Sequence, residues 1–134
     1  MSLFDSMNIA STALSAQTTR INTIASNMAN ANTVASTPED TYRARAPIFQ
    51  AVLEGESDQL VVRVKSIEEV GREPRQEFEP EHPLADENGF IYTPDLDVTT
   101  EMANMMSASR SFQSAIEVIN TSKQLALRTL TLGK

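Results

Sequence analysis

The chain has 134 residues, of which 40% are hydrophobic and 5% aromatic, and it contains neither cysteine nor tryptophan. A chain of this length can bury one modest core, which must here be mainly aliphatic and methionine-based. The lack of cysteine excludes disulfides, Cys-ligated zinc, iron–sulfur clusters and thiol nucleophiles, and a net charge of −7 argues against nucleic acid as a partner.

Charge and proline are concentrated in the middle of the sequence. Residues 1–36 contain one acid and one base, and residues 96–134 contain three acids and four bases. Residues 37–95 contain 14 acids and 6 bases, a net charge of −8, together with all six prolines. Because proline is poorly tolerated inside helices, we predict two helical ends, 1–36 and 96–134, around a central domain at 37–95.

The N-terminal segment carries a heptad pattern over residues 3–35, and Ser2 with Asp5 is its expected start. Its stripe positions recur in alternating steps of three and four residues, with Gln17 in the one polar gap. The apolar members are Met7, Ala10, Leu14, Ile21, Ile24, Met28 and Ala31. Such a stripe lets a helix pack along a partner helix at a small crossing angle. The opposite face is rich in Ser, Thr and Asn, which are weak helix formers, so we expect partners to stabilise this helix.

The central segment predicts a small β-rich unit. Residues 60–65 alternate in the strand period, and residues 47–53 are a weaker strand candidate. Asn88-Gly89 before residues 90–92 is a tight-turn signal, since both residues tolerate positive φ. We expect residues 72–87 to be irregular.

The C-terminal segment predicts a second long helix, with Asp97 or Thr99 as its cap and Gly133 past its end. One apolar stripe consists of Val98, Met102, Met105, Phe112, Ile116, Ile119, Ala126 and Leu130. An adjacent face carries Ala108, Ala115, Val118, Leu125 and Leu132, which suits contact with more than one neighbour. The predicted fold class is therefore α+β, with two long terminal helices forming a coiled-coil layer and a small central β-rich domain.

The sequence offers little for chemistry, and we predict no catalytic, cofactor or metal site. His82 is the only histidine and is expected in an exposed loop. The oxygen-rich stretch at 86–89 departs from calcium-loop spacing and favours a turn. No apolar run is long enough to span a membrane, and the N-terminus lacks the features of a classical secretory signal.

Residues 24–33, Ile-Ala-Ser-Asn-Met-Ala-Asn-Ala-Asn-Thr, resemble the N-terminal signature of the bacterial flagellar axial proteins, which build the rod and hook. The residues of this motif that we single out are Ala25, Ser26, Asn27, Asn30, Asn32 and Thr33. Three further stretches, at residues 42–45, 83–90 and 101–133, narrow the resemblance to the proximal-rod proteins of the flagellar basal body.

The resemblance implies a structural, non-enzymatic subunit that polymerises through its terminal helices into the torque-transmitting drive shaft around the export channel. Its implied partners are copies of itself, other proximal-rod proteins, the rod-to-MS-ring adaptor, the distal rod protein and the flagellar type III export apparatus. Its implied location is the rod of the basal body, which crosses the periplasm, reached without a cleaved signal peptide. No cofactor is implied.

On this interpretation we expect an assembly seam, within or between subunits, in which apolar side chains of the two helices meet. Its members are Met7, Leu14, Ile21, Ile24, Met28, Met102, Met105, Phe112, Ile116 and Ile119. Asn27 and Asn30 flank this seam and, having both donors and acceptors, are expected to form hydrogen bonds between subunits.

Two other interpretations fit the residues less well. One is a cytosolic coiled-coil adaptor or chaperone whose helices pair in a closed oligomer. The other is a small hydrolase that uses His82 and neighbouring acids.

Overall fold

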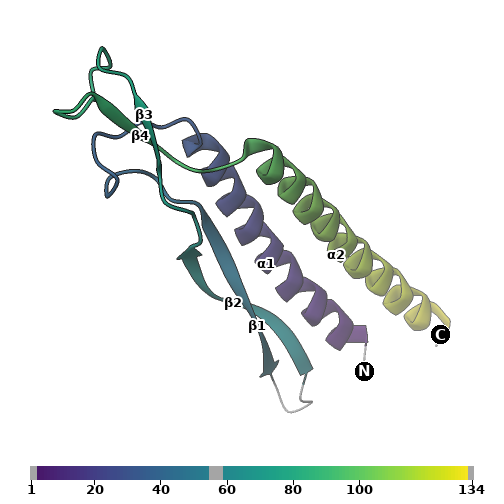
Figure 1. The fold of residues 1–134 in the computed structure, drawn as a ribbon. Coiled ribbons are helices and arrows are strands. Elements are labelled where there is room, and N and C mark those ends of the chain that lie inside the picture. Colours follow the sequence, from purple (N-terminus) through teal and green to yellow (C-terminus); the bar gives the residue numbers. More distant parts are fainter. Residues whose placement is uncertain (1–2, 55–58, 133–134) are drawn as a thin grey trace. The chain divides into compact units, whose positions relative to one another are not determined.

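The computed structural model describes residues 3–54 and 59–132. Its elements in chain order are α1 (Leu3–Asn30), β1 (Arg45–Glu54), β2 (Gln59–Glu69), β3 (Arg75–Phe78), β4 (Phe90–Thr93) and α2 (Val98–Leu132) (Figure 1). Two long helices and a small β region between them in sequence confirm the predicted α+β class. The roles expected of Ser2 and Gly133 at the helix ends lie outside the described residues.

The chain divides into two compact units, and each long helix contributes to both. Unit 1 consists of Met1–Ile21, Pro47–Ser66 and Met106–Lys134. Unit 2 consists of Asn22–Ala46 and Ile67–Met105. The division into domains at residues 36 and 96 stays a prediction.

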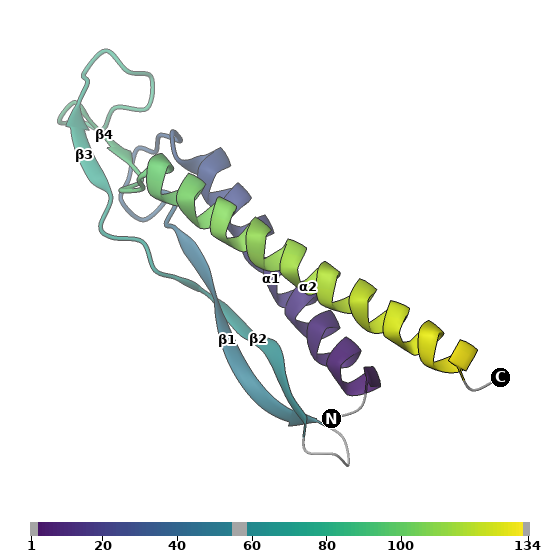
Figure 2. The same ribbon diagram turned by 90° about the vertical axis from the view of Figure 1, so that its right-hand side faces the viewer.

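In unit 1, α1 lies between the paired strands β1 and β2 and the C-terminal part of α2 (Figures 1 and 2). The Thr12 hydroxyl accepts a hydrogen bond from the Val62 backbone N–H at 3.4 Å, which joins α1 to β2. The buried side chains are small: Val61 and Ala108 are fully buried, and Ala10 and Ala115 nearly so. Small side chains allow the helix backbones to approach closely. Both strands predicted in this region are present.

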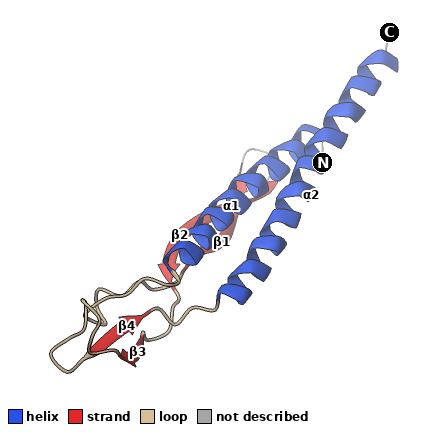
Figure 3. Cartoon of the chain, turned by 90° about the horizontal axis from the view of Figure 1, so that it is seen from above, coloured by secondary structure: helices blue, strands red, loops and turns tan. Residues whose placement is uncertain are grey.

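In unit 2, β3 and β4 form a short antiparallel sheet with the register Arg75↔Thr93 through Phe78↔Phe90 (Figure 3). Ala35, which follows α1, exchanges two backbone hydrogen bonds with Tyr92 and so extends the pairing on the other side of β4. The predicted tight turn is present: Gly89 has φ +81°, and a Cβ there would lie 3.0 Å from the Phe78 ring.

The expectation that residues 72–87 are irregular was wrong for residues 75–78, which form β3, and is confirmed for the remainder of this stretch. The sequence of residues 75–78, Arg-Gln-Glu-Phe, has no apolar alternation, and every side chain of this strand is exposed. The strand is formed instead by closure of the turn, in which the Asp86 carboxylate accepts the backbone N–H groups of Asn88 and Phe90. The Phe78 and Phe90 rings, 5.2 Å apart, pack edge to face across the register.

The helix boundaries follow local hydrogen bonding. α1 ends at Asn30, five residues before the predicted end at residue 35. Turns follow directly, in which the Ala31 N–H donates to the Met28 carbonyl and the Thr33 N–H donates to the Asn30 carbonyl. α2 begins at Val98 because Asp97 caps it: its carboxylate accepts the N–H of Thr99 at 3.0 Å and the hydroxyl of Thr100 at 2.6 Å. These bonds lower the pKa of Asp97, and the hydrogen bond from the Thr100 hydroxyl makes the largest contribution to that decrease.

Candidate functional site

The most densely bonded polar group of unit 2 is the side chain of Asn27, which is 2% exposed. Its Nδ2 donates to the Arg45 carbonyl and to Glu101 Oε2, both at 2.9 Å. Its Oδ1 accepts from the Tyr42 hydroxyl at 2.8 Å and from the Arg45 N–H at 2.9 Å. A single amide therefore joins α1, the chain leading into β1, and the first turn of α2.

This arrangement replaces the role that the sequence suggested for Asn27. A primary amide offers two donor hydrogens and two acceptor lone pairs, and all four are used within the chain. Asn27 therefore joins segments within unit 2, and its amide has no free donor or acceptor for a hydrogen bond to another subunit. The network was missed because the sequence does not reveal that three segments far apart along the chain converge on one residue.

Glu101 is the distant partner in this network and lies in the first turn of α2. Its other carboxylate oxygen accepts from Asn104 Nδ2 at 3.4 Å, and a carboxylate in this turn is favoured by the positive end of the helix dipole. The contact with Asn27 thus fixes where α2 begins against the end of α1.

The rest of the signature motif is more exposed. Ala25, Ser26, Asn32 and Thr33 are exposed, and Asn30 donates from Nδ2 to the Ser26 carbonyl at 2.8 Å, within the last turn of α1. The expected inter-subunit bonds of Asn30 stay a prediction.

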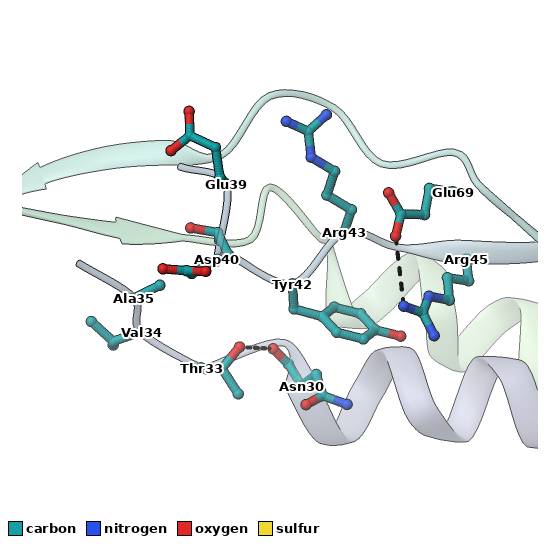
Figure 4. A pocket seen from close by; sticks show the side chains of 11 residues that line it. Asn30, Thr33, Val34, Ala35, Glu39, Asp40, Tyr42, Arg43, Arg45 and Glu69 are labelled. Atoms are coloured by element: carbon teal, nitrogen blue, oxygen red, sulfur yellow. Dashed lines mark hydrogen bonds and ion pairs between the residues drawn. The ribbon is translucent and has the colours of Figure 1, made fainter. Parts of the chain in front are cut away.

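Next to this motif, unit 2 has a polar hollow of about 400 Å³. Figure 4 shows Tyr42 in it, with Asn30 and Thr33 on one side and the ion pair of Arg45 with Glu69 on the other. The Arg45 guanidinium also lies 5.9 Å from the centre of the Tyr42 ring, a cation–π distance. Among the charged residues that line this hollow, Arg45 and Glu69 therefore form an ion pair with each other, with 3.6 Å between their nearest N and O atoms.

The α1 members of the expected assembly seam lie on the helix face that is covered within the chain. Ile24 is 5% exposed, and Met7, Leu14, Ile21 and Met28 are partly buried. Ala10, Ile24 and Ala31, at heptad spacing, are buried together with them.

The α2 members divide between two environments. Met105, Phe112 and Ile119 are partly buried, whereas Met102 is 54% and Ile116 38% exposed. The buried positions of α2 in unit 1 are instead small residues at heptad spacing, Ala108, Ala115 and Ser122. The sequence pattern predicted that the larger apolar side chains of α2 are buried. Small side chains are buried instead, because they allow the helices to pack closely. The heptad spacing of Ala108 and Ala115 was the sequence feature that indicated this face. The role of the seam itself stays a prediction.

The part of the chain that the structure describes has no group of three or more His, Asp or Glu side chains placed to hold a metal ion. His82 lies in a turn, where its Nδ1 accepts the Leu84 N–H at 3.1 Å. Asp86, the first residue of the oxygen-rich stretch, organises the turn before β4, which confirms the turn interpretation. Within the described residues, no helix is apolar over a sufficient length to cross a membrane.

In the described residues, buried polar groups join separate segments of the chain, and several large apolar side chains of α2 are exposed. Two known families match parts of the chain. The family of flagella basal body rod proteins matches residues 7–34, and the C-terminal family of flagellar basal body rod FlgEFG proteins matches residues 87–132. These matches define the class as flagellar basal-body rod proteins.

Full-length relatives narrow the class further. Flagellar basal-body rod protein FlgC is 46% identical in Yersinia enterocolitica, 44% in Salmonella typhimurium and 42% in Escherichia coli O157:H7. Each alignment covers 134 residues and all of both chains. The chain belongs to the FlgC family, and it is a structural subunit of the flagellar basal-body rod. A cytosolic adaptor or chaperone is not supported.

Proposed function

We propose that the chain builds the proximal part of the rod by packing α1 and α2 against neighbouring subunits, so that its work is mechanical and not catalytic. Torque then passes through interlocked helices around a central export channel. The observation that carries this proposal is the full-length FlgC relationship combined with apolar side chains left open on α2.

The open apolar surface is extensive along α2. Met102, Met106, Ile116, Val118, Leu125, Leu127 and Leu130 are between 38% and 70% exposed. Apolar area gains about 25 cal/mol per Å² when it is removed from water, so these side chains supply a driving force for association. Exposed large apolar side chains in this number along one helix suit contact with more than one neighbouring subunit.

The finer assignments come from the family resemblance and form part of the proposal. The neighbours are further copies of the chain, other proximal-rod proteins, the adaptor between rod and MS ring, and the distal rod protein. The flagellar type III apparatus exports the chain without a cleaved signal peptide, and the assembled rod crosses the periplasm. The terminal segments 1–36 and 96–134, which are near neutral in net charge, then meet neighbours, and the acidic segment 37–95 faces outward.

The test is genetic and biochemical. The gene is deleted in the bacterium that encodes it, and an epitope-tagged copy is restored from a plasmid. We expect the deletion to abolish swimming and hook–basal-body formation, and the tagged chain to co-purify with basal bodies from the restored strain. Normal basal bodies in the deletion strain, or a tagged chain found only in the cytosol of swimming cells, would refute the proposal.

A further inference from the structure

The turn before β4 contains an asparagine that is followed directly by a glycine, Asn88-Gly89, and the Asn88 side chain is exposed. In such a pair the backbone nitrogen of the second residue can attack the side-chain carbonyl carbon of the first, which makes asparagine thermolabile. Glycine hinders this attack least, because it has no side chain. Every other asparagine of the chain is followed by a residue that has one. Asn88 is therefore the asparagine most susceptible to loss of its amide.

The structure holds the attacking nitrogen in a hydrogen bond. The Gly89 N–H donates to the Asp86 carbonyl at 3.0 Å, and the Gly89 carbonyl accepts from the Glu79 N–H at 2.9 Å. Asp86 Oδ1 accepts the N–H groups on either side, from Asn88 at 2.8 Å and from Phe90 at 2.9 Å. Because the Gly89 nitrogen must lose its proton in order to attack, the turn has to open before the reaction can begin.

We propose that Asn88 is a deamidation site whose reaction is held back by the folded turn. In the open chain, the Gly89 nitrogen gives its proton to base, bonds to the Asn88 side-chain carbonyl carbon and expels the amide nitrogen as ammonia. Water then opens the succinimide ring at either of its carbonyl groups and leaves aspartate or isoaspartate at position 88. Water is the only co-reactant.

The isoaspartate product is incompatible with the turn. It places an extra carbon atom in the backbone before Gly89, so the Gly89 and Phe90 N–H groups no longer reach their acceptors on Asp86. The register of β3 with β4, in which Phe78 pairs with Phe90, depends on this closure. The folded turn thus protects Asn88, and a chain that stays unfolded loses the residue on which the turn depends.

The first test compares the full-length chain in native buffer and in guanidinium chloride, at the same mildly alkaline pH and temperature. Peptide mass spectrometry measures how fast the Asn88 amide is replaced by a carboxyl group. We expect the folded chain to react roughly tenfold more slowly, and a factor of ten corresponds to an opening free energy of about 1.4 kcal/mol. Equal rates in the two solvents, or an Asn88 that stays intact in guanidinium chloride, would overturn the proposal.

Asn32 is the internal control for the chemistry. It is also exposed, but the β-branched Thr33 follows it and hinders the attack. We expect Asn32 to keep its amide in guanidinium chloride over the time in which Asn88 reacts. Loss of both amides at the same rate would show that the glycine does not select Asn88.

The second test opens the turn by substitution. Asp86→Ala removes the carboxylate that accepts two N–H groups of the turn, so deamidation of Asn88 in native buffer should rise toward its rate in denaturant. The matched control is Glu87→Ala, which removes an exposed acid from the same turn and should leave the rate unchanged. An unchanged rate in Asp86→Ala, or an equal rise in Glu87→Ala, would contradict protection by the turn.

A third measurement follows the consequence for the sheet. Chains aged in guanidinium chloride are returned to native buffer, and hydrogen exchange is measured at the Glu79 and Phe90 amides. We expect faster exchange in chains that contain isoaspartate and normal protection in Asn88→Ser, which has no amide to lose during the same ageing. Normal protection in the isoaspartate-containing chains would refute the effect on the turn.

Discussion

At the scale of single residues, we expect unit 2 to depend strongly on Asn27, because its amide bonds polar groups of three segments. In Asn27→Ala the Arg45 backbone and the Glu101 carboxylate lose partners at a buried site. Each unsatisfied buried group costs about 1–3 kcal/mol, so we expect the free energy of unfolding to fall by about 3 kcal/mol.

Urea denaturation followed by circular dichroism measures this loss. The control is Asn32→Ala, the same substitution at an exposed position of the motif, which should change stability by about 0.5 kcal/mol or less. Equal stability of the two variants would show that the Asn27 network contributes nothing to the fold.

At the scale of elements, the start of α2 depends on the charge of Asp97. Bonds from the Thr100 hydroxyl and the Thr99 N–H lower the pKa of this carboxyl, so its stabilising effect is present above the pKa of the unfolded chain. That effect is lost as the pH falls through the lower pKa of the folded chain. Asp97→Asn retains a capping oxygen but does not titrate. We therefore expect the wild-type chain to melt higher than Asp97→Asn at neutral pH and the difference to shrink below about pH 4.

Thermal melts of both proteins across the acid range provide this comparison, because the other carboxylates titrate equally in each. A difference in melting temperature that stays constant down to pH 2 would contradict a role for the charged cap.

An Ile→Asp substitution should affect stability differently on the buried face of α1 and on the exposed face of α2. Ile24 is buried within the chain, so Ile24→Asp places a carboxylate in an apolar site and should lower stability by about 3 kcal/mol or more. Ile116 is 38% exposed, so Ile116→Asp should lower the melting temperature much less than Ile24→Asp does. Both variants should stop rod assembly and swimming, the first through the fold and the second through the interface.

Melting curves and swimming assays on both variants separate these causes. Swimming at the wild-type level by Ile116→Asp would show that the exposed face of α2 makes no essential contact.

Much of the secondary structure could be predicted because it is encoded locally. The heptad stripes located both helices, and Asn88-Gly89 located the turn before β4. Asp97 or Thr99 was expected to cap α2, and the structure shows that Asp97 does. β3 could not be predicted in this way, because its exposed side chains show no alternation and its pairing depends on a turn closed by Asp86.

At the scale of the whole molecule, the sequence did not predict which residues far apart along the chain contact one another. The Asn27 network needs α1, the approach to β1 and α2 to converge, and no spacing along the chain encodes that convergence. The covered face of α2 was predicted only in part: the adjacent face with Ala108 and Ala115 was recognised, but the stripe of larger apolar side chains was expected to form the seam. The signature residue Asn27 thus serves the fold, and several large apolar side chains of α2 are exposed in the single chain.

The central claim is that α1 and α2 together make the inter-subunit contacts of the rod. Cryo-electron microscopy of basal bodies purified from the native bacterium tests it most directly, because the map places each helix of the chain among its neighbours. We predict that both helices lie in the inner layer around the channel, with Met102, Ile116 and Leu130 covered by adjacent subunits. A map in which these side chains face solvent and the central β region makes the subunit contacts would contradict the account.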